Sequence, residues 1–332
     1  MKLFFIAMMS MAVVMTNVSG VEAKSMREVA DHLQDISVTI KSEAQYSKSE
    51  GSGAMIIREV NGQKVTFVWT AAHVIDNLRS VRTVINESGQ PVKVVEFEDP
   101  KIVKELVESG RRVGEIKMDA RVIKYSNADT GEDLALLMVR AKDYAKSGAT
   151  FKLSAKKKGD DNIVPIGTRL FHVGSLLGQM GANSMTTGII SQVGRTLGKV
   201  EYDQTTVTAF PGSSGGGVYL TDGRYMGMLV RGAGEGFNLI VPVRRMVRWA
   251  EKNDIMWALD ASVEMPSLDE IDDIPVEDSG VSSKKKSKGD DKSLRSLPYL
   301  IKVTPIGQDR ELNDELNTRP VEESISPKLE LR

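Results

Sequence analysis

The sequence predicts an all-β protein in which two antiparallel six-stranded β-barrels are followed by a C-terminal helix. Short apolar runs alternate with turn signals through roughly two hundred residues, and about a dozen of these runs have the length of strands. The segments between them are too short for the crossover helices that parallel sheets require. The 332 residues suffice for one large domain with appendages or for two modest domains.

The first 23 residues have the features of a signal peptide. Lys2 supplies a positive start, residues 3–14 form an apolar run, and small residues near Ala23 fit a cleavage site. The apolar run is too short for a transmembrane helix, so we expect no stable membrane span after cleavage. We therefore expect export, with the mature protein periplasmic or secreted.

Residues 24–50 predict a helix and a strand ahead of the main domain. Apolar residues at helical spacing predict the helix over 25–35, a strand follows at 36–40, and a polar loop occupies 41–50. Beyond it, period-two and apolar patterns bounded by turn residues predict a series of strands. These strands are 64–69, 80–85, 92–97, 121–125, 134–139, 168–173, 185–193, 205–209, 216–220, 225–230 and 237–241.

Two more helices are predicted within the domain. Four apolar side chains between Ile102 and Val107 share one helical face of residues 99–109, and Gly110 would end that helix. Residues 242–259 carry apolar positions at helical spacing and close the domain.

The domain is predicted to cover residues 51–259, and residues 260–332 to form a charged, disordered tail. Asp, Glu, Ser and Lys dominate the tail, and such a composition buries too little apolar surface to fold. The net charge of the whole chain is −1, which gives no reason to expect a nucleic-acid partner. Cysteine is absent, so the core alone must stabilise the fold. We expect no metal and no cofactor, and homo-oligomerisation is left open.

The segment from Pro211 to Gly217 places serines within a run of glycines. Glycines let the backbone turn sharply, so several N–H groups can point to one place. A serine hydroxyl held there can attack a carbonyl while those N–H groups stabilise the oxyanion. Such runs are also common in plain loops, and a base and an acid must be found elsewhere.

Only three histidines are present: His32, His73 and His172. His172 lies in an apolar strand pattern and is interpreted as a satisfied structural residue, and His32 as a surface residue. His73 follows an apolar run and has small residues around it, which leave room for a substrate. Histidine titrates near neutral pH, so His73 is the candidate general base.

Asp133 stands at the start of an apolar strand and is the candidate acid that orients the histidine. Asp129, four residues earlier, is interpreted as an ordinary turn residue. The chain order His, Asp, Ser differs from that of subtilisin-like and α/β-hydrolase enzymes. An esterase of the α/β-hydrolase type is therefore disfavoured.

Together these motifs resemble those of trypsin-like serine proteases, and most closely the HtrA/Deg branch, from about residue 36 to residue 259. The matching motifs are Gly51-Ser52-Gly53, Thr70-Ala71-Ala72-His73, Asp133-Leu134-Ala135-Leu136-Leu137, Thr187-Gly188-Ile189-Ile190-Ser191 and Gly212-Ser213-Ser214-Gly215-Gly216. The resemblance implies a chymotrypsin-like fold and makes Ser214, not Ser213, the nucleophile. No PDZ domain is recognisable after the protease segment.

The resemblance implies a serine endopeptidase that acts on polypeptides through His73, Asp133 and Ser214. The oxyanion hole would be formed by the backbone N–H groups of Gly212, Ser213 and Ser214. The residues expected to bind substrate are Thr208, Val230, Arg231 and Gly232. Two departures, Phe210 and Ser213 before the nucleophile, leave open the alternative of an inactive protease-like binding protein.

Overall fold

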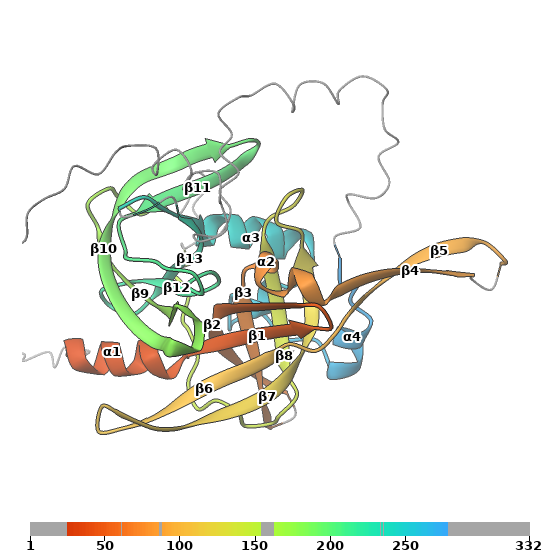
Figure 1. Ribbon diagram of the computed structural model, residues 1–332, viewed down its shortest axis with the longest axis horizontal. Helices are drawn as coiled ribbons and strands as arrows, with labels where there is room; N and C mark the ends of the chain where they lie inside the picture. The colour runs from red at the N-terminus through yellow and green to blue at the C-terminus, as the bar shows by residue number, and fades with distance from the viewer. Residues whose placement is uncertain are drawn as a thin grey trace, which may run out of the picture.

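The computed structural model describes residues 25–277 apart from residues 61, 86–87, 154–162, 233 and 235. Two closed six-stranded barrels lie side by side in it, and the predicted fold class is confirmed (Figure 1). The predicted signal peptide and residues 278–332 lie outside the described residues. No helix within the described ranges is long and apolar enough to cross a membrane.

The first barrel has the strand order β1-β2-β3-β8-β7-β6, with every pair antiparallel. Its strands are β1 (Ser37–Ala44), β2 (Ser47–Val60), β3 (Gln63–Thr70), β6 (Lys101–Glu108), β7 (Arg111–Ser126) and β8 (Leu134–Val139). Apolar side chains on both faces of its sheet, such as Ile40, Met55, Phe67 and Leu136, are fully buried. β1 and the start of β2 are part of this barrel, so the domain begins before residue 51, where the prediction placed its start.

The second barrel has the order β10-β11-β14-β13-β12-β9 and is also antiparallel. Its strands are β9 (Arg169–Leu176), β10 (Gly181–Leu197), β11 (Val200–Thr205), β12 (Gly217–Leu220), β13 (Tyr225–Gly232) and β14 (Asn238–Pro242). Leu170, Ile190, Val218 and Ile240 are buried together in its core. The predicted strand at 205–209 is wrong beyond Thr205, because the chain leaves the sheet there to enter the serine loop.

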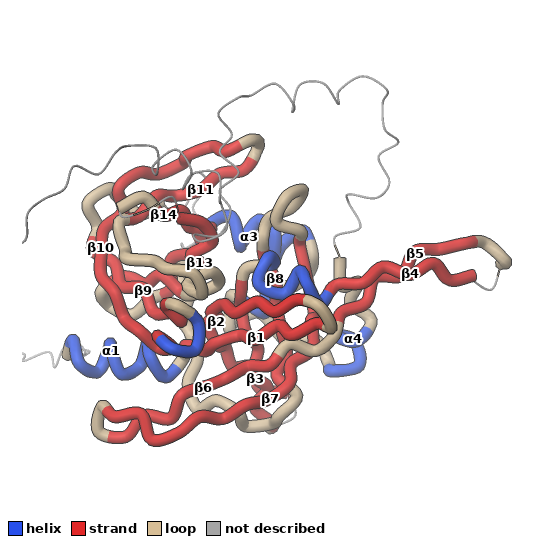
Figure 2. Tube along the Cα trace, viewed as in Figure 1, coloured by secondary structure: helices blue, strands red, loops and turns tan. Residues whose placement is uncertain are grey.

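Strands β4 (Arg79–Ile85) and β5 (Pro91–Phe97) pair only with each other, and their hairpin projects away from both barrels (Figure 2). Most side chains of β4 are exposed. The hairpin follows the short helices α2 (Ala72–Ile75) and η1 (Asp76–Leu78).

Helix α1 (Met26–Asp35) contacts β6 of the first barrel and β10 of the second. Ser25 and Glu28 form a capping box at its start, which satisfies free N–H groups of the first turn. Helix α3 (Val243–Lys252) follows the second barrel, and its Trp249 packs edge-on against Trp69 of β3 in the first. Both helices therefore connect the two barrels. The short helices η2 (Gly178–Met180), η3 (Met256–Ala258) and α4 (Leu268–Asp272) complete the described elements.

Two local predictions are wrong for the same physical reason. Residues 99–109 form strand β6 rather than a helix, and residues 41–50 belong largely to the hairpin of β1 and β2 rather than to a loop. The apolar spacing between Ile102 and Val107 fits a helix, but β6 exchanges backbone hydrogen bonds with both β1 and β7. Long-range pairing overrides local periodicity here.

Residues 260–277 do not match the prediction of a disordered tail. Ile271 of α4 is buried, and the Tyr125 N–H donates to the Val276 carbonyl oxygen at 2.8 Å. Arg121 and Asp272 form an ion pair beside this contact. The segment after α3 thus returns to the first barrel and packs along the end of β7.

Candidate active site

His73 lies in α2, directly after β3 brings the chain out of the first barrel. Its neighbours Ala72 and Val74 are buried and hold the helical turn in place. The His73 side chain is 24% exposed, so one edge of the ring remains accessible from outside.

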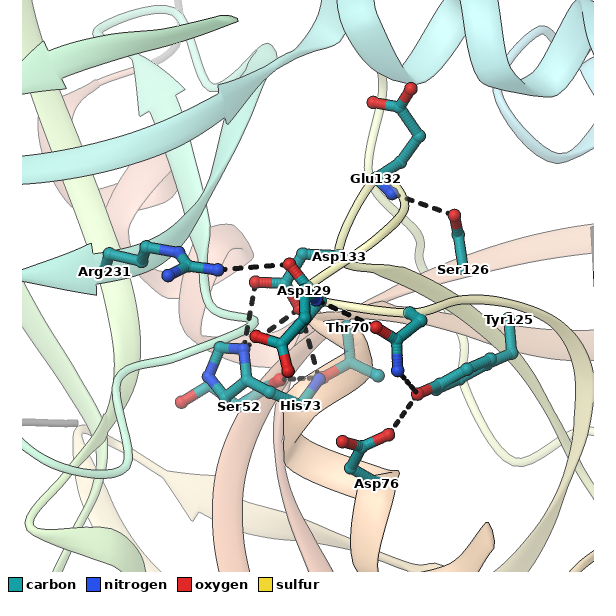
Figure 3. A network of polar contacts seen from close by, with 12 residues as sticks. Ser52, Thr70, His73, Asp76, Tyr125, Ser126, Asp129, Glu132, Asp133 and Arg231 are labelled. Atoms are coloured by element: carbon teal, nitrogen blue, oxygen red, sulfur yellow. Dashed lines mark hydrogen bonds and ion pairs between the residues drawn. The ribbon is translucent and has the colours of Figure 1, made fainter. Parts of the chain in front are cut away.

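Asp133 precedes β8, and its side chain is fully buried against His73 (Figure 3). Both carboxylate oxygens lie 3.0 Å from His73 Nδ1, and Oδ1 also accepts the His73 backbone N–H at 3.1 Å. A carboxylate only accepts, so Nδ1 carries the proton and Nε2 is left as the basic nitrogen. The geometry brings together the predicted base and its predicted orienting acid.

The pKa values of the pair move in opposite directions. Burial lowers the pKa of His73, but the charge and hydrogen bond of Asp133 outweigh it, and the net shift is upward. Burial raises the pKa of Asp133, yet His73 and the nearby Arg231 outweigh that effect, and the net shift is downward. Asp133 therefore stays ionised at neutral pH and stabilises a protonated His73.

The loop before Asp133 is ordered by a set of polar contacts (Figure 3). Asn127 Oδ1 accepts the N–H groups of Asp129 and Thr130 at 2.9 and 3.1 Å, which forms an Asx turn. Asn127 Nδ2 donates to the Tyr125 hydroxyl, which in turn donates to Asp76. Asp129 is confirmed as a turn residue by these contacts.

The serine loop runs from Phe210 to Gly216 and contains a turn closed by the Ser213 N–H, which donates to the Phe210 carbonyl oxygen at 2.9 Å. Gly212 has φ +93° inside this turn, a value that a residue with a Cβ rarely adopts. A Cβ at Gly212 would also lie 2.3 Å from the Ser175 carbonyl oxygen. The loop shape therefore depends on glycine at this position.

The N–H groups of Gly212 and Ser214 point away from the carbonyl groups whose hydrogen bonds hold the serine loop. The Pro211 carbonyl accepts the Leu177 N–H at 2.7 Å, so the Gly212 N–H of the same planar peptide points to the opposite side. The Ser213 carbonyl accepts the Gly216 N–H at 3.0 Å, and the Ser214 N–H again points oppositely. These two groups are suited to hold an oxyanion.

The expected oxyanion donor at Ser213 needs correction. Its N–H is used inside the turn, and its buried side-chain Oγ accepts the Phe210 N–H at 3.1 Å. Ser213 therefore closes the turn through both its backbone and its hydroxyl, and is not free to donate to a substrate. Among the described residues, the N–H groups of Gly212 and Ser214 make no such bond.

Ser52 of β2 joins the serine loop to the first barrel. Its N–H donates to the Ser214 carbonyl and its hydroxyl to the Gly212 carbonyl, both at 2.7 Å. The same hydroxyl accepts the Ser175 N–H at 2.7 Å. The Gly51-Ser52-Gly53 motif thus positions the loop that contains the candidate nucleophile.

A cleft of about 410 Å³ brings His73 and Ser214 onto one surface. Within the described part of the chain, no hydrogen bond joins the Ser214 hydroxyl to His73. The remaining lining residues are Ser49, Glu50, Val74, Ala128, Asp129, Ala209, Phe210, Pro211, Gly212, Ser213, Leu229, Val230, Arg231 and Gly232.

Three of the four predicted substrate residues, Val230, Arg231 and Gly232, line the cleft, but Thr208 does not. The Thr208 carbonyl accepts the Thr186 hydroxyl at 3.0 Å, and the next residue, Ala209, lines the cleft instead.

The cleft lining also includes Glu50 and Ala128, which the sequence did not predict, and Asp129, which was predicted only as a turn residue. Glu50 directly precedes the Gly51-Ser52-Gly53 motif, and this adjacency is the sequence feature that could have indicated its place in the cleft.

No group of three or more metal-ligating His, Cys, Asp or Glu side chains occurs among the described residues.

Comparison with known proteins matches residues 51–228 to the trypsin-like peptidase domain. Over 118 residues the chain is 31% identical to the serine protease Do-like HtrB of Bacillus subtilis, a match covering 33% of this chain and 24% of HtrB. The HtrA-type protease AlgW with tripeptide aligns with a TM-score of 0.49 and 17% identity, over 71% of this chain and 65% of AlgW. A serine endoprotease from Yersinia pestis aligns with a TM-score of 0.46 and 18% identity, over 69% and 66%. The chain thus spans less than two thirds of these relatives. By its matched domain it belongs to the trypsin-like peptidase family.

Proposed function

We propose that the protein is a serine endopeptidase that cleaves polypeptides with Ser214 as nucleophile, His73 as base and Asp133 as orienting acid. The observation that carries this proposal is the buried Asp133 carboxylate, 3.0 Å from His73 Nδ1, in a cleft that His73 shares with Ser214. An ionised carboxylate on Nδ1 leaves Nε2 basic, which is the requirement for removing the serine proton.

Substrate would bind as an added strand along β13. On the side of β13 that faces β12, backbone pairing ends at Leu229, whose N–H and carbonyl bond Gly216 and Gly215. The backbone from Val230 to Gly232 lines the cleft beyond that point. An extended peptide can satisfy this open edge with main-chain hydrogen bonds.

The chemistry then follows in two halves. As Ser214 Oγ bonds to the scissile carbonyl carbon, its proton passes to His73 Nε2 and the carbonyl oxygen becomes an oxyanion. The N–H groups of Gly212 and Ser214 stabilise that charge. The C–N bond breaks as His73 returns the proton to the leaving amine, and an acyl-enzyme remains. Water then attacks the acyl carbon as His73 takes its proton, and the C–Oγ bond breaks as His73 returns that proton to Ser214 Oγ, which releases the acid and restores the enzyme.

The residue before the cut is proposed to be small or medium aliphatic. Ala209, Leu229 and Val230 line the cleft beside Ser214 and carry no charge. The charged lining residues, Glu50, Asp129 and Arg231, come from three separate segments of the chain.

Diisopropyl fluorophosphate labelling tests the proposal. We expect one adduct on Ser214 in the folded protein and none in Ser214→Ala, together with casein cleavage by the wild type alone. Equal cleavage by both proteins, or absence of an adduct, contradicts the proposal.

The alternative is a protease-like binding protein without turnover. One observation favours it, namely that the Ser214 hydroxyl makes no hydrogen bond to His73 in the described structure. Peptide binding without an adduct at Ser214 supports this alternative.

Export of the mature chain is a separate proposal, tested by sequencing the N-terminus of protein recovered outside the cytoplasm.

A further inference from the structure

The segment from Ser126 to Asp133 belongs to the first barrel, yet two arginines from the other half of the molecule hold it. Arg231 of β13 contacts one end, and Arg245 of α3 contacts the other. Figure 3 shows Arg231 reaching across toward the loop that precedes Asp133. The segment connects β7 to the acid of the site, so its anchoring decides where that acid lies.

Arg245 makes four directed contacts from a buried position. Its side chain is only 4% exposed, and its Nε lies 2.5 Å from Glu132 Oε2. Its Nη2 donates to the Glu132 carbonyl, and its Nη1 donates to the Glu201 carbonyl at 3.0 Å. The guanidinium also stacks 4.7 Å from the centre of the Tyr202 ring. Arg245 thus ties Glu132 to β11 of the second barrel.

Glu132, which directly precedes Asp133, makes hydrogen bonds through its N–H, its carbonyl and its carboxylate. Its N–H donates to Ser126 Oγ at 2.9 Å, while its carboxylate and its carbonyl both bind Arg245. The Glu132 carbonyl belongs to the same peptide as the Asp133 N–H, so Arg245 sets the orientation of that peptide.

Asp133 has φ +54°, in the left-handed region that residues other than glycine rarely occupy. A strained backbone of this kind persists only where its surroundings over-determine it. The Arg245–Glu132 contacts supply that constraint on one side, and the His73 N–H and ring supply it on the other. At the far end, Arg231 Nη2 donates to the Ala128 carbonyl at 3.2 Å.

We propose that Arg245 and Glu132 form a clamp that positions Asp133 for its bond to His73. The clamp thereby fixes the position of the first barrel relative to the barrel that carries Ser214. This inference rests on the proposed serine peptidase function. Neither residue lines the cleft, so the clamp acts through Asp133 and not on the substrate. Its loss therefore lowers kcat and leaves KM nearly unchanged.

The kinetic test uses Arg245→Met, Arg245→Lys and a matched control, Arg248→Met. Arg248 lies on the same helix and pairs with Glu201 at 2.9 Å, but its side chain is 56% exposed and does not reach Glu132. We expect Arg245→Met to lower kcat about 100-fold with KM within about twofold, as a small misplacement of a catalytic group does. Lysine is expected to restore part of kcat, and Arg248→Met to match the wild type.

A second readout does not depend on turnover. The chain has three histidines, so the titration of His73 can be resolved by NMR once His73→Gln assigns its signal. In the wild type Asp133 raises the pKa of His73 despite burial of the ring. We expect that pKa to fall in Arg245→Met, because Asp133 is no longer held against Nδ1. This readout still tests the clamp if the wild type proves inactive.

Glu132→Gln covers the case in which Arg245→Met does not fold. It removes the carboxylate but retains the carbonyl contact to Arg245, and the Glu132 side chain is 38% exposed, so folding should tolerate it. We expect an intermediate loss of kcat and a smaller fall in the His73 pKa. If the folded variants show wild-type kcat and wild-type His73 titration, the clamp is overturned and Arg245 only packs α3 against the barrels.

Discussion

The loop that presents Ser214 and the loop that presents Asp133 are held in different ways. Backbone hydrogen bonds and glycines with positive φ fix the serine loop, with Gly212 at +93° and Gly215 at +86°. Side chains of distant residues hold both ends of the aspartate loop in addition to its local Asx turn, and Asp133 itself carries the unusual φ. The serine loop also depends on distant Ser52, but its glycines can be recognised from the local sequence, whereas the arginines that hold the aspartate loop have no such local signal.

The largest expected effect is at the proposed nucleophile. Ser214→Ala should lower peptidase activity by about 10⁴-fold or more, because the hydroxyl that is proposed to form the acyl-enzyme is gone. The melting temperature should stay close to that of the wild type, since the loop is held through its backbone. A purified variant that retains substantial casein cleavage would show that the loop serves another purpose.

Gly212→Ala, compared with Ser213→Ala, should distinguish the effect of the backbone shape of the serine loop on activity from the effect of one of its side chains. A Cβ there meets the Ser175 carbonyl at 2.3 Å and opposes a φ of +93°, so the Gly212 N–H must leave the cleft. We expect kcat to fall by about 10² to 10³, the usual loss for one oxyanion donor. The comparison variant is Ser213→Ala, which removes one hydrogen bond to the Phe210 N–H and should cost about 1 kcal/mol of stability. Equal kcat losses in the two variants would contradict the role given to Gly212.

His172 contacts the residue that follows the serine loop, and its titration tests whether this contact stabilises the folded state. Its ring is fully buried, Nδ1 donates to the Gly217 carbonyl at 3.0 Å, and Nε2 has no hydrogen-bond partner within the described residues. The sequence interpretation as a structural histidine agrees with this position, but only one of its nitrogens is satisfied. Burial lowers its pKa to about 4, so the folded state resists protonation that the unfolded chain accepts.

The contribution of neutral His172 to the free energy of unfolding is fully present above about pH 6.5 and is lost as the pH falls toward 4. At pH 5 the loss should be about 2 kcal/mol relative to His172→Gln, whose side chain does not titrate. Urea unfolding of both proteins at pH 7.5 and pH 5 measures this difference. Parallel changes in the two proteins would show that His172 does not couple the loop to pH.

The smallest expected effect is a shift in the pH profile of activity. The pKa of His73 is raised, so kcat/KM should reach half its maximum above about pH 6.5 and fall tenfold per unit below that point. Asp133→Asn removes the charge that raises this pKa and should move the remaining activity to lower pH. A wild-type midpoint well below pH 6.5 would mean that Asp133 does not hold its bond to His73 in solution.

Much of the fold was predictable from local pattern. Runs such as 134–139 and 225–230 are bounded by turns and became strands of the two barrels. The helix expected at 99–109 failed because the pairing of β6 with β1 and β7 is invisible to periodicity. The return of residues 260–277 to the first barrel was also missed, since few of its residues are apolar and Ile271 is buried only by residues distant in the sequence, on β5 and β7.

The sequence by itself determined the chemical groups of the site and their order, because the motifs around His73, Asp133 and Ser214 consist of neighbouring residues whose backbone needs are local. It also indicated the glycines that shape the serine loop. Only the tertiary structure decided that Ser213 closes the turn instead of donating to an oxyanion, and that Thr208 lies outside the cleft. The tertiary structure alone also placed Arg245 on Glu132, because a contact across 113 residues of chain depends on how two barrels and a helix pack.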